Sequence, residues 1–541
     1  MKEILKQLLA VLSGGVIVYI CKIGLEKLVE NAVKSSFEKS IEIFKNNLYR
    51  ATKAYEILLG REMRFYEKVD VLIAELVPLE QDLLFYLKKD SADNRWNEFR
   101  SNFLRYCELT KDLKNETLIH QLYIPEEIVK VKIILVKKSY AIGELLSIEK
   151  KSPYRVELEH TSAYGGCQLA HMTYEGQLQI KYRRVKDVIT RIGGFSEEIV
   201  LPVLPAVHPW NYRNKMTAPV GSVHGETLIG YYKQGTHDII PMDTCFIHQE
   251  GNNRLLRFVK RFMSKHSISA YNEKTKQGSV RHIMGRVGDG GKMMAVIITA
   301  TEELPKKEYW IEAIQQEMPE VVSLYHNVQN KVGNVILGKT MHHIWGSPSI
   351  TSSLCGLSFE VSPYSFFQVN KEQAEILYDK ALECAELTGN EVVIDAYCGT
   401  GTISLCLARK AKKVIGIEIV KPAIEDAKKN AQKNKIENVE FIAEDAGTYM
   451  PKLYQQGLRP DVIVMDPVRA GCSEEVLKAA ASMQPKRIVY VSCNPATFAR
   501  DAKILKEQGY ELTKVQPVDM FPQTMHVEAV ALLTKSERTP I

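Results

Sequence analysis

A cysteine stands where an apolar run meets a turn in the carboxyl-terminal part of the chain. Residues 488–491 are apolar apart from the polar tip of Tyr490, and Ser492-Cys493-Asn494-Pro495 follows them directly. In an open α/β sheet, ligands bind beyond the carboxyl ends of the strands, so a thiol at this point faces a cleft. The alternative for an intracellular cysteine is the role of a small buried apolar residue. The strand-end setting favours nucleophilic catalysis by Cys493.

One carboxylate is expected at the same edge as this thiol, and a second is a candidate base. Residues 462–465 form an apolar run that leads into Asp466-Pro467, where proline stops the strand and holds the acid at the cleft. His526-Val527-Glu528 follows near the carboxyl end. A thiolate that adds to carbon 6 of a uracil activates carbon 5, and a separate base must then remove the carbon 5 proton. Glu528 is the expected base; its alternative is an ion pair with Arg469 or Arg500.

A glycine turn upstream has the features of a nucleotide-binding loop. Residues 395–402, Asp-Ala-Tyr-Cys-Gly-Thr-Gly-Thr, follow an apolar strand and open a helix. Gly399 and Gly401 allow the backbone to approach a ligand closely. The third glycine of the dinucleotide fingerprint is replaced by Ser404, which disfavours NAD.

Acids at the next two strand ends complete this expected pocket. Glu418 lies about twenty residues after the glycines, where a carboxylate accepts hydrogen bonds from ribose hydroxyls. Asp445 follows the third strand, where a polar side chain meets an adenine. Together these strand ends favour S-adenosylmethionine as the cofactor. A structural turn with solvated acids is the alternative.

The length and composition of the chain indicate a multidomain globular protein. At 541 residues it is too long for one hydrophobic core, and about three domains are expected. The excess of 71 Lys and Arg over 65 Asp and Glu permits a nucleic-acid partner without demanding one. Ten cysteines without dense spacing indicate reduced thiols in a cytoplasmic protein.

The amino-terminal segment 1–124 is expected to be a helical extension. Residues 7–21 carry no charge between Lys6 and Lys22, so 4–25 is a candidate membrane anchor. As a helix, the uncharged stretch spans about 22 Å, short of the ~30 Å hydrocarbon core. An interfacial anchor and a helix packed on its neighbour are the alternatives. No small-residue cleavage site follows, which argues against a removable signal peptide.

Three further regions follow this extension. Residues 125–152 contain short β-like runs at 129–133 and 141–146. Residues 153–355 mix strands, glycine turns and helices, with basic and aromatic residues interleaved at 210–215. Such a cluster suits stacking and phosphate contact on single-stranded RNA, which makes Arg213 and Lys215 candidate substrate contacts. An exposed strand edge is the alternative interpretation of that cluster.

The carboxyl-terminal region 356–541 alternates strand and helix. Strands are expected at 391–395, 413–418, 438–442, 461–466 and 487–493. Alternation of this kind with apolar strands is typical of an α/β fold with a doubly wound, mostly parallel sheet.

These motifs together resemble the RNA uracil-5-methyltransferases, which form 5-methyluridine in 23S rRNA and in tRNA. The resemblance covers roughly 125–538, and its motifs are Ser365-Phe366-Phe367-Gln368-Val369-Asn370, Asp395 to Gly399, Asp466-Pro467, Ser492 to Thr497 and His526-Val527-Glu528. It implies a Rossmann-like class I methyltransferase domain, preceded by an α+β RNA-binding region.

The resemblance also assigns roles to individual residues. It implies that Gln368, Tyr397, Glu418 and Asp466 contact S-adenosylmethionine. Cys493 is then the nucleophile and Glu528 the base, and Arg469 joins the candidate substrate contacts.

The finer resemblance is to the branch that methylates 23S rRNA, through residues 165–169 and His171. We therefore expect a cytoplasmic, monomeric enzyme that methylates carbon 5 of a uridine in 23S rRNA. A tRNA uridine-5-methyltransferase is one alternative. A membrane-tethered RNA-binding protein with a decayed enzyme domain is another.

Three departures from the family pattern carry further expectations. The four cysteines that hold an iron–sulfur cluster in the ribosomal branch correspond to Leu158, Tyr164, Cys167 and Cys245, so two ligands are missing and no metal cluster is expected. Asp-Pro-Pro-Arg is replaced by Asp466-Pro467-Val468-Arg469, which loosens the turn. The amino-terminal OB-like barrel is reduced to a remnant within 125–152, which leaves open sheet edges and weakens the expectation of RNA affinity there.

Overall fold

The computed structural model describes residues 119–120, 128–136, 141–156, 166–233, 236–331, 333 and 335–536. Contacts divide the chain into two units, Met1–Pro153 and Tyr154–Ile541. The candidate membrane anchor at 4–25 and almost all of the expected helical extension lie outside the described residues. In the described part of the chain, no helix combines the length and apolarity that a membrane crossing requires.

The first unit contains a small antiparallel sheet in the order β1-β2-β3. Its strands are β1 (Ile119–His120), β2 (Ile128–Val136) and β3 (Ala141–Lys150). Strands β2 and β3 are longer than the β-like runs predicted from the sequence. The helical prediction is wrong for residues 119–120, because Ile119 and His120 pair with Lys130 and Val129 of β2.

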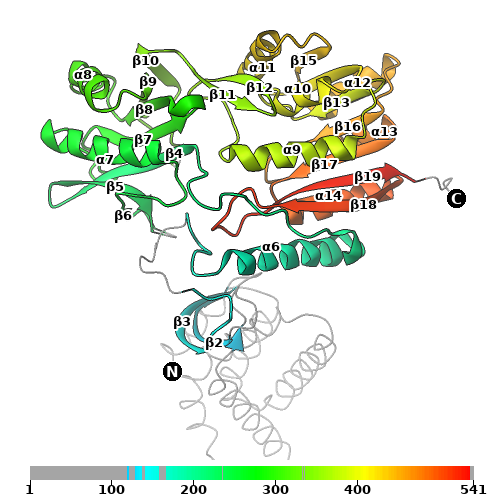
Figure 1. Ribbon diagram of the computed structural model, residues 1–541, viewed down its shortest axis with the longest axis horizontal. Helices are drawn as coiled ribbons and strands as arrows, with labels where there is room; N and C mark the ends of the chain where they lie inside the picture. The colour runs from blue at the N-terminus through cyan, green and yellow to red at the C-terminus, as the bar shows by residue number, and fades with distance from the viewer. Residues whose placement is uncertain are drawn as a thin grey trace, which may run out of the picture. The chain divides into compact units, whose positions relative to one another are not determined.

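The carboxyl-terminal part of the second unit is built on a seven-stranded sheet (Figure 1). In spatial order its strands are β15 (Val439–Ala443), β14 (Lys413–Glu418), β13 (Val392–Ala396), β16 (Val462–Met465), β17 (Arg487–Ser492), β19 (Glu528–Lys535) and β18 (Tyr510–Val518). The first five are parallel, and β19 is antiparallel to both of its neighbours. The predicted doubly wound, mostly parallel sheet is confirmed.

Apolar cores cover both faces of this sheet, which explains why its strands are continuous apolar runs rather than alternating ones. Along β16, Val462 and Val464 join one core, whereas Ile463 and Met465 join the other. The first face is covered by α9 (Lys371–Ala385), α10 (Thr402–Ala408) and α11 (Lys421–Lys433). The second is covered by α12 (Ala446–Gln455), α13 (Glu474–Ser482) and α14 (Pro495–Glu507).

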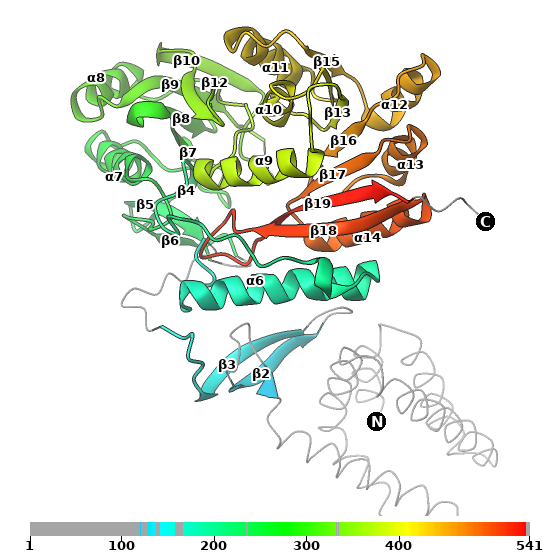
Figure 2. The same ribbon diagram turned by 45° about the vertical axis from the view of Figure 1, so that its right-hand side comes forward.

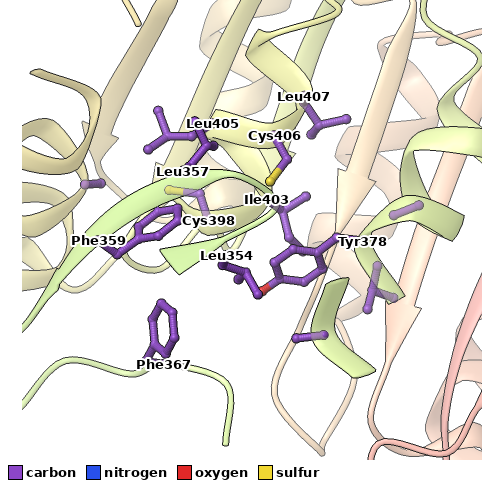
Figure 3. Close-up of a cluster of buried hydrophobic side chains, with 14 of the residues drawn as sticks. Leu354, Leu357, Phe359, Phe367, Tyr378, Cys398, Ile403, Leu405, Cys406 and Leu407 are labelled. Atoms are coloured by element: carbon purple, nitrogen blue, oxygen red, sulfur yellow. The ribbon is translucent and has the colours of Figure 1, made fainter. Parts of the chain in front are cut away.

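The short helix α10 fixes the end of the predicted cofactor loop. Figure 3 shows Ile403, Leu405 and Cys406 among apolar side chains that include Leu354 and Phe359. Leu354 and Phe359 come from the hairpin of β11 (Ile350–Leu354) and β12 (Leu357–Val361). The loop after β13 is therefore anchored by burial on the helix that follows it.

Helix α6 (Tyr174–Val188) precedes this sheet in sequence by about two hundred residues but packs against it. Val185 of α6 and Ile189, in the π-helical turn that follows (Ile189–Gly193), belong to the same core as Phe498 of α14. Figures 1 and 2 both draw α6 alongside α14 and β18. Val200 and Leu204 then form parallel bridges to Val515 and Val518 of β18. Residues before 355 therefore pack on the carboxyl-terminal sheet, so the domain boundary that the sequence predicted at residue 355 does not separate two cores.

The rest of the second unit is a seven-stranded, mainly antiparallel sheet. In spatial order its strands are β10 (Thr340–Gly346), β9 (Val321–Val328), β8 (Met293–Thr299), β7 (Val280–Val287), β4 (Lys215–Val223), β5 (Glu226–Tyr232) and β6 (Ile239–Pro241). Its core includes residues of α7 (Glu250–Lys265) and α8 (Lys307–Glu317), such as Phe258 and Trp310. Lys215 opens β4 and pairs with Arg286 of β7, whereas β5 pairs with β4 only at Val220–Val223, so the alternative of a strand edge stays open for Lys215 on that side.

Candidate active site

The structure brings the predicted thiol and both predicted carboxyls to one edge of the parallel sheet. Cys493 follows the last residue of β17, and Asp466 follows the last residue of β16. Glu528 is the first residue of β19, which runs the opposite way, and Ala529 pairs with Ser492. An antiparallel strand therefore starts where its parallel neighbour ends. Cys493 is half-buried, so it does not have the fully buried setting of a core cysteine.

These three groups interact through their charges. Withdrawal from water, followed by the negative charge of Asp466, raises the pKa of Glu528 to about 8. The pKa of Asp466 is about 7, again because of burial. Burial, followed by the charges of Glu528 and Asp466, raises the pKa of the Cys493 thiol to about 11. Raised carboxyl pKa values in a cleft suit proton transfer near neutral pH.

Arg469 is the cation of this cluster. It opposes the upward shifts of both Cys493 and Glu528. Its guanidinium lies 3.3 Å from both ring nitrogens of His526. Burial and nearby cations, Arg469 first among them, lower the pKa of His526 to about 4, so this ring is neutral at pH 7.

Arg500 is engaged elsewhere, which answers one alternative for Glu528. Its guanidinium lies 2.6 Å from the buried carboxylate of Asp501 and also donates to the carbonyls of Ala470 and Cys472. In the part of the chain that the structure describes, Glu528 forms no ion pair. The carboxyl is therefore available for chemistry.

The loop after β13 has the geometry of a ligand cradle. Gly399 has φ +54° and no atom within 4 Å of the place where a side chain would begin. Gly401 has φ +82°, and an added Cβ would lie 2.8 Å from Phe441 Cζ. A side chain at either position would strain the backbone, and at Gly399 open space lies beside the chain. Tyr397 precedes the two glycines and also has a left-handed backbone, with φ 69°.

Glu418 and Asp445 lie at strand ends, as predicted, but differ in their surroundings. The Glu418 carboxylate accepts hydrogen bonds from the backbone N–H groups of Gly399 at 3.3 Å and Val420 at 2.9 Å, which fixes it beside the glycine loop. Asp445 is exposed and caps α12 by accepting from the Thr448 N–H at 2.9 Å. The helix cap accounts for Asp445 without a ligand, and its contact with an adenine stays a prediction.

Gln368 and Asp466 both interact with Tyr378, a buried residue of α9. The buried Tyr378 hydroxyl lies 3.0 Å from Thr402 Oγ1 and also hydrogen-bonds with Gln368. The charge of Asp466 raises the pKa of Tyr378, which places both near the start of α10. One oxygen of the buried Asp395 accepts from Ser404 Oγ at 2.5 Å, and the other has no partner among the described residues. This edge of the sheet therefore contains a carboxylate held by backbone N–H groups, that of Glu418, and a buried carboxyl oxygen of Asp395 without a described partner.

A cavity of about 660 Å³ adjoins this edge and is lined by both parts of the second unit. The three predicted substrate contacts, Arg213, Lys215 and Arg469, all line it, and so does Gln368. The remaining lining residues are Gly166, Thr217, Tyr231, Tyr232, Ile247, Phe366, Val369, Phe521, Thr524 and His526. A volume of this size suits a nucleotide.

One cation that the sequence did not single out lies next to the basic wall of this cavity, but it is buried and does not line the cavity. Arg286 of β7 pairs in register with Lys215 of β4, so two like charges face each other across the sheet. Burial, Arg286 and Arg213 lower the pKa of Lys215 to about 8. Lys215, Arg213 and Arg286 form no ion pair with a described carboxylate, and Arg286 Nε has no described hydrogen-bond partner. Facing like charges are unfavourable unless an anion binds between them.

The two cysteines that remain from the cluster pattern lie in a small apolar core. Cys167 and Cys245 are both buried, together with Ala170, Tyr212, Met242 and Ile247. Leu158 and Tyr164 lie outside the described residues. Among the residues that are described, no three His, Cys, Asp or Glu side chains are grouped as a metal site.

Protein purified without air is expected to lack the brown colour and visible absorption of an iron–sulfur cluster, because a four-iron cluster normally requires four thiolates. Absorption spectroscopy with iron and sulfide assays checks this. About four iron and four sulfide per chain would contradict it and would mean that other side chains replace the missing ligands.

Residues 356–536 match the family model described as tRNA (Uracil-5-)-methyltransferase. A Bacillus cereus protein named as an uncharacterized RNA methyltransferase is 51% identical over 418 residues, which cover 77% of this chain and 91% of that protein. An Oceanobacillus iheyensis protein of the same description is 48% identical and covers 76% of this chain and 90% of its own. These matches extend well beyond the carboxyl-terminal domain.

One solved structure is similar over most of the chain. The Pyrococcus abyssi tRNA (uracil-54, C5)-methyltransferase in complex with S-adenosyl-L-homocysteine is 28% identical, with a TM-score of 0.62. The match covers 75% of this chain and 92% of that one.

Proposed function

Because the chain belongs to the RNA uracil-5-methyltransferase family, we propose that it methylates carbon 5 of a uridine in 23S rRNA through a covalent adduct with Cys493. One observation carries the proposal. The half-buried Cys493 thiol shares a sheet edge with two carboxyls of raised pKa, Asp466 and Glu528. Few other reactions require a nucleophilic thiol and a separate base at the edge of an S-adenosylmethionine domain.

The cofactor is S-adenosylmethionine, which supplies an electrophilic methyl group. Gly399 and Gly401 let the loop approach it, and Glu418, held by two backbone N–H groups, has lone pairs left for ribose hydroxyls. Ile419 is 66% exposed directly after Glu418 and offers an apolar surface for the adenine. We assign Tyr397, Gln368 and Asp466 to the remaining contacts.

The protein side chains then divide the reaction into addition and elimination. The Cys493 sulfur, as thiolate, adds to carbon 6 of the uracil, and the electrons of the C5–C6 double bond move to form an enolate. Arg469 stabilises negative charge at this edge and lowers the pKa of the thiol. After carbon 5 has gained its methyl group, the Glu528 carboxylate takes the carbon 5 proton. The electrons of that C–H bond re-form the double bond, and the C6–S bond breaks to release the Cys493 thiolate.

RNA binding is assigned to the basic cavity wall. Arg213 and Lys215 line the cavity without described carboxylate partners, and the buried Arg286 pairs in register with Lys215, so positive charge gathers here and suits a phosphate of the RNA backbone. Beside them, Trp210 and Phe246 form an edge-to-face pair with ring centroids 6.3 Å apart, and both rings are partly exposed. Exposed aromatics next to cations are typical of single-stranded RNA surfaces. The target uridine must leave its stack to reach Cys493.

Lys215→Met is expected to weaken RNA binding about tenfold and to lower the slope of log affinity against log salt by about one, because one phosphate contact is lost. Affinity for S-adenosylmethionine should not change. Filter binding across a salt series measures both effects. Lys265→Met, which changes an exposed lysine at the end of α7, is the matched control. Equal effects from the two variants would contradict a specific phosphate contact.

A second candidate substrate is tRNA. The similar Pyrococcus abyssi structure is that of a tRNA uracil-54 enzyme, and its match covers 92% of that protein. The preference for 23S rRNA rests on the resemblance at residues 165–169 and His171. In the structure, Leu169 of this segment donates its N–H to the carbonyl of Gln523, in the loop before Glu528.

Incubation of the full chain with labelled S-adenosylmethionine and unmodified 23S rRNA or tRNA transcripts, followed by nucleoside mapping, tests the proposal. Label in 5-methyluridine from 23S rRNA alone is expected. Label from tRNA alone would overturn the substrate but keep the reaction. No 5-methyluridine from either transcript or from total RNA would overturn the reaction and favour a decayed enzyme.

A further inference from the structure

The loop at 519–527, between β18 and β19, leads directly into Glu528. Phe521, Thr524 and His526 of this loop line the cavity. The loop therefore sets both the position of the expected base and one wall of the substrate site. It is held from outside the sheet, largely by one face of α6.

A buried ion pair forms the first anchor. Lys181 Nζ lies 2.5 Å from Asp519 Oδ1, and neither side chain is exposed. The second oxygen of Asp519 accepts from the Tyr174 hydroxyl at 2.9 Å. Lys181 also donates to the carbonyl of Phe521 at 3.1 Å. Helix α6 thus satisfies both oxygens of Asp519 and ties the ammonium to the loop backbone.

A buried pair of amides forms the second anchor. Gln177 Nε2 donates to Gln523 Oε1 at 2.8 Å, and the Gln523 backbone N–H donates to Gln177 Oε1 at 3.0 Å. Gln523 has φ 68°, a left-handed conformation that is unfavourable for a residue with a side chain. Such a conformation persists only where its surroundings fix it.

A third anchor holds the residue just before His526. Arg184 Nη1 donates to the Met525 carbonyl at 2.8 Å, and the Met525 N–H donates to Gln168 Oε1 at 3.1 Å. Tyr174, Gln177, Lys181 and Arg184 are spaced three, four and three residues apart, so they lie on one face of α6. That face follows the loop from Asp519 to Met525.

We propose that this face of α6 positions the catalytic base, with Lys181, Gln177 and Tyr174 as positioning residues for Glu528. The inference rests on the proposed function, in which Glu528 removes the carbon 5 proton. A buried ion pair is a poor way to gain stability, because desolvation offsets its attraction, but it does restrict the geometry. Three polar anchors on a loop that ends at a base restrict where the carboxylate lies.

Elimination is the step that should depend most on this geometry. Transfer of the carbon 5 proton requires a short distance between that proton and the Glu528 carboxylate. The thiol that adds to the uracil follows β17, and the cofactor loop follows β13, so neither lies on the loop that α6 holds. A displaced loop should therefore slow release of the methylated base from Cys493 more than it slows formation of the adduct.

Lys181→Met tests this, because it keeps the length of the side chain and removes its donors. We expect breakdown of the methylated adduct to slow at least tenfold, with adduct visible on denaturing gels. The KM for S-adenosylmethionine should stay within about twofold. Arg183→Met, an exposed change on the same helix, should behave as wild type. The rate is measured in single turnovers with labelled cofactor and an RNA that the wild type converts to 5-methyluridine.

Tyr174→Phe covers the case in which Lys181→Met does not fold. It removes only the hydroxyl that donates to Asp519 and should slow adduct breakdown about threefold or more. Thermal melts establish that each variant is folded. Wild-type adduct breakdown in a folded variant would overturn the inference, as would equal losses in cofactor binding, adduct formation and breakdown. Wild-type enzyme that forms no 5-methyluridine would instead overturn the proposed function.

Discussion

Cys493→Ala is expected to abolish formation of 5-methyluridine, by a factor on the order of 10⁴ or more. The thiol is the group that activates carbon 5, and no second half-buried cysteine shares its edge among the described residues. Affinity for S-adenosylmethionine should stay within a few-fold, because the cofactor loop lies beyond other strands. Transfer of label from S-adenosylmethionine into RNA, with cofactor binding measured by calorimetry, checks both expectations.

A substrate that cannot complete elimination gives an independent test of the same thiol. RNA containing 5-fluorouridine should form an adduct with the wild type that survives denaturation. Its carbon 5 carries fluorine in place of the proton that the base must remove, so elimination cannot follow. Cys493→Ala should form none. Cys355, which is also half-buried but lies in the β11–β12 turn, provides the matched control. Robust methylation by Cys493→Ala, or loss of the adduct in Cys355→Ala, would show that another residue is the nucleophile.

The sequence predicted this edge because the groups that form it are local to strand ends. Apolar runs indicate parallel strands, and the carboxyl ends of parallel strands meet at one edge. Cys493, Asp466 and Glu418 needed no further information to be placed there. Glu528 required one more fact, the antiparallel direction of β19, which the sequence pattern did not show. Only the family resemblance placed it beside the thiol.

The contacts that hold the loop at 519–527 could not be predicted from strand ends. Lys181 and Asp519 are 338 positions apart, and a lysine on an amphipathic helix is usually solvated. Arg286 faces Lys215 only through the register of β4 with β7, which no local pattern gives. Helix α6 is far from the carboxyl-terminal sheet in sequence, so its packing against that sheet was not predicted. Residues 153–355 were therefore predicted as one region. Long-range pairing of buried polar groups is the part of the fold that patterns do not predict.

Glu528→Gln is expected to lower turnover by about 10²–10⁴-fold, the usual loss when a general base is removed. The amide is close to the carboxylate in size, so the fold should persist, but it cannot take a proton. Since the base acts only after the methyl group has moved, the variant should accumulate a methylated RNA–protein adduct through Cys493. Denaturing gels with labelled cofactor reveal this species. Glu511→Gln, an exposed change on β18, is a control.

The pH dependence should identify Glu528 in the wild type. Because the pKa of Glu528 is raised to about 8 by burial and by Asp466, most of its carboxyl is protonated at pH 7. Only the ionised form accepts the carbon 5 proton, so adduct breakdown should speed up as pH rises and level off above about 8. Below that pH the rate should fall roughly tenfold per unit. In Glu528→Gln this rise should vanish. A variant that turns over near the wild-type rate, without adduct and with the pH profile unchanged, would assign proton removal to another group.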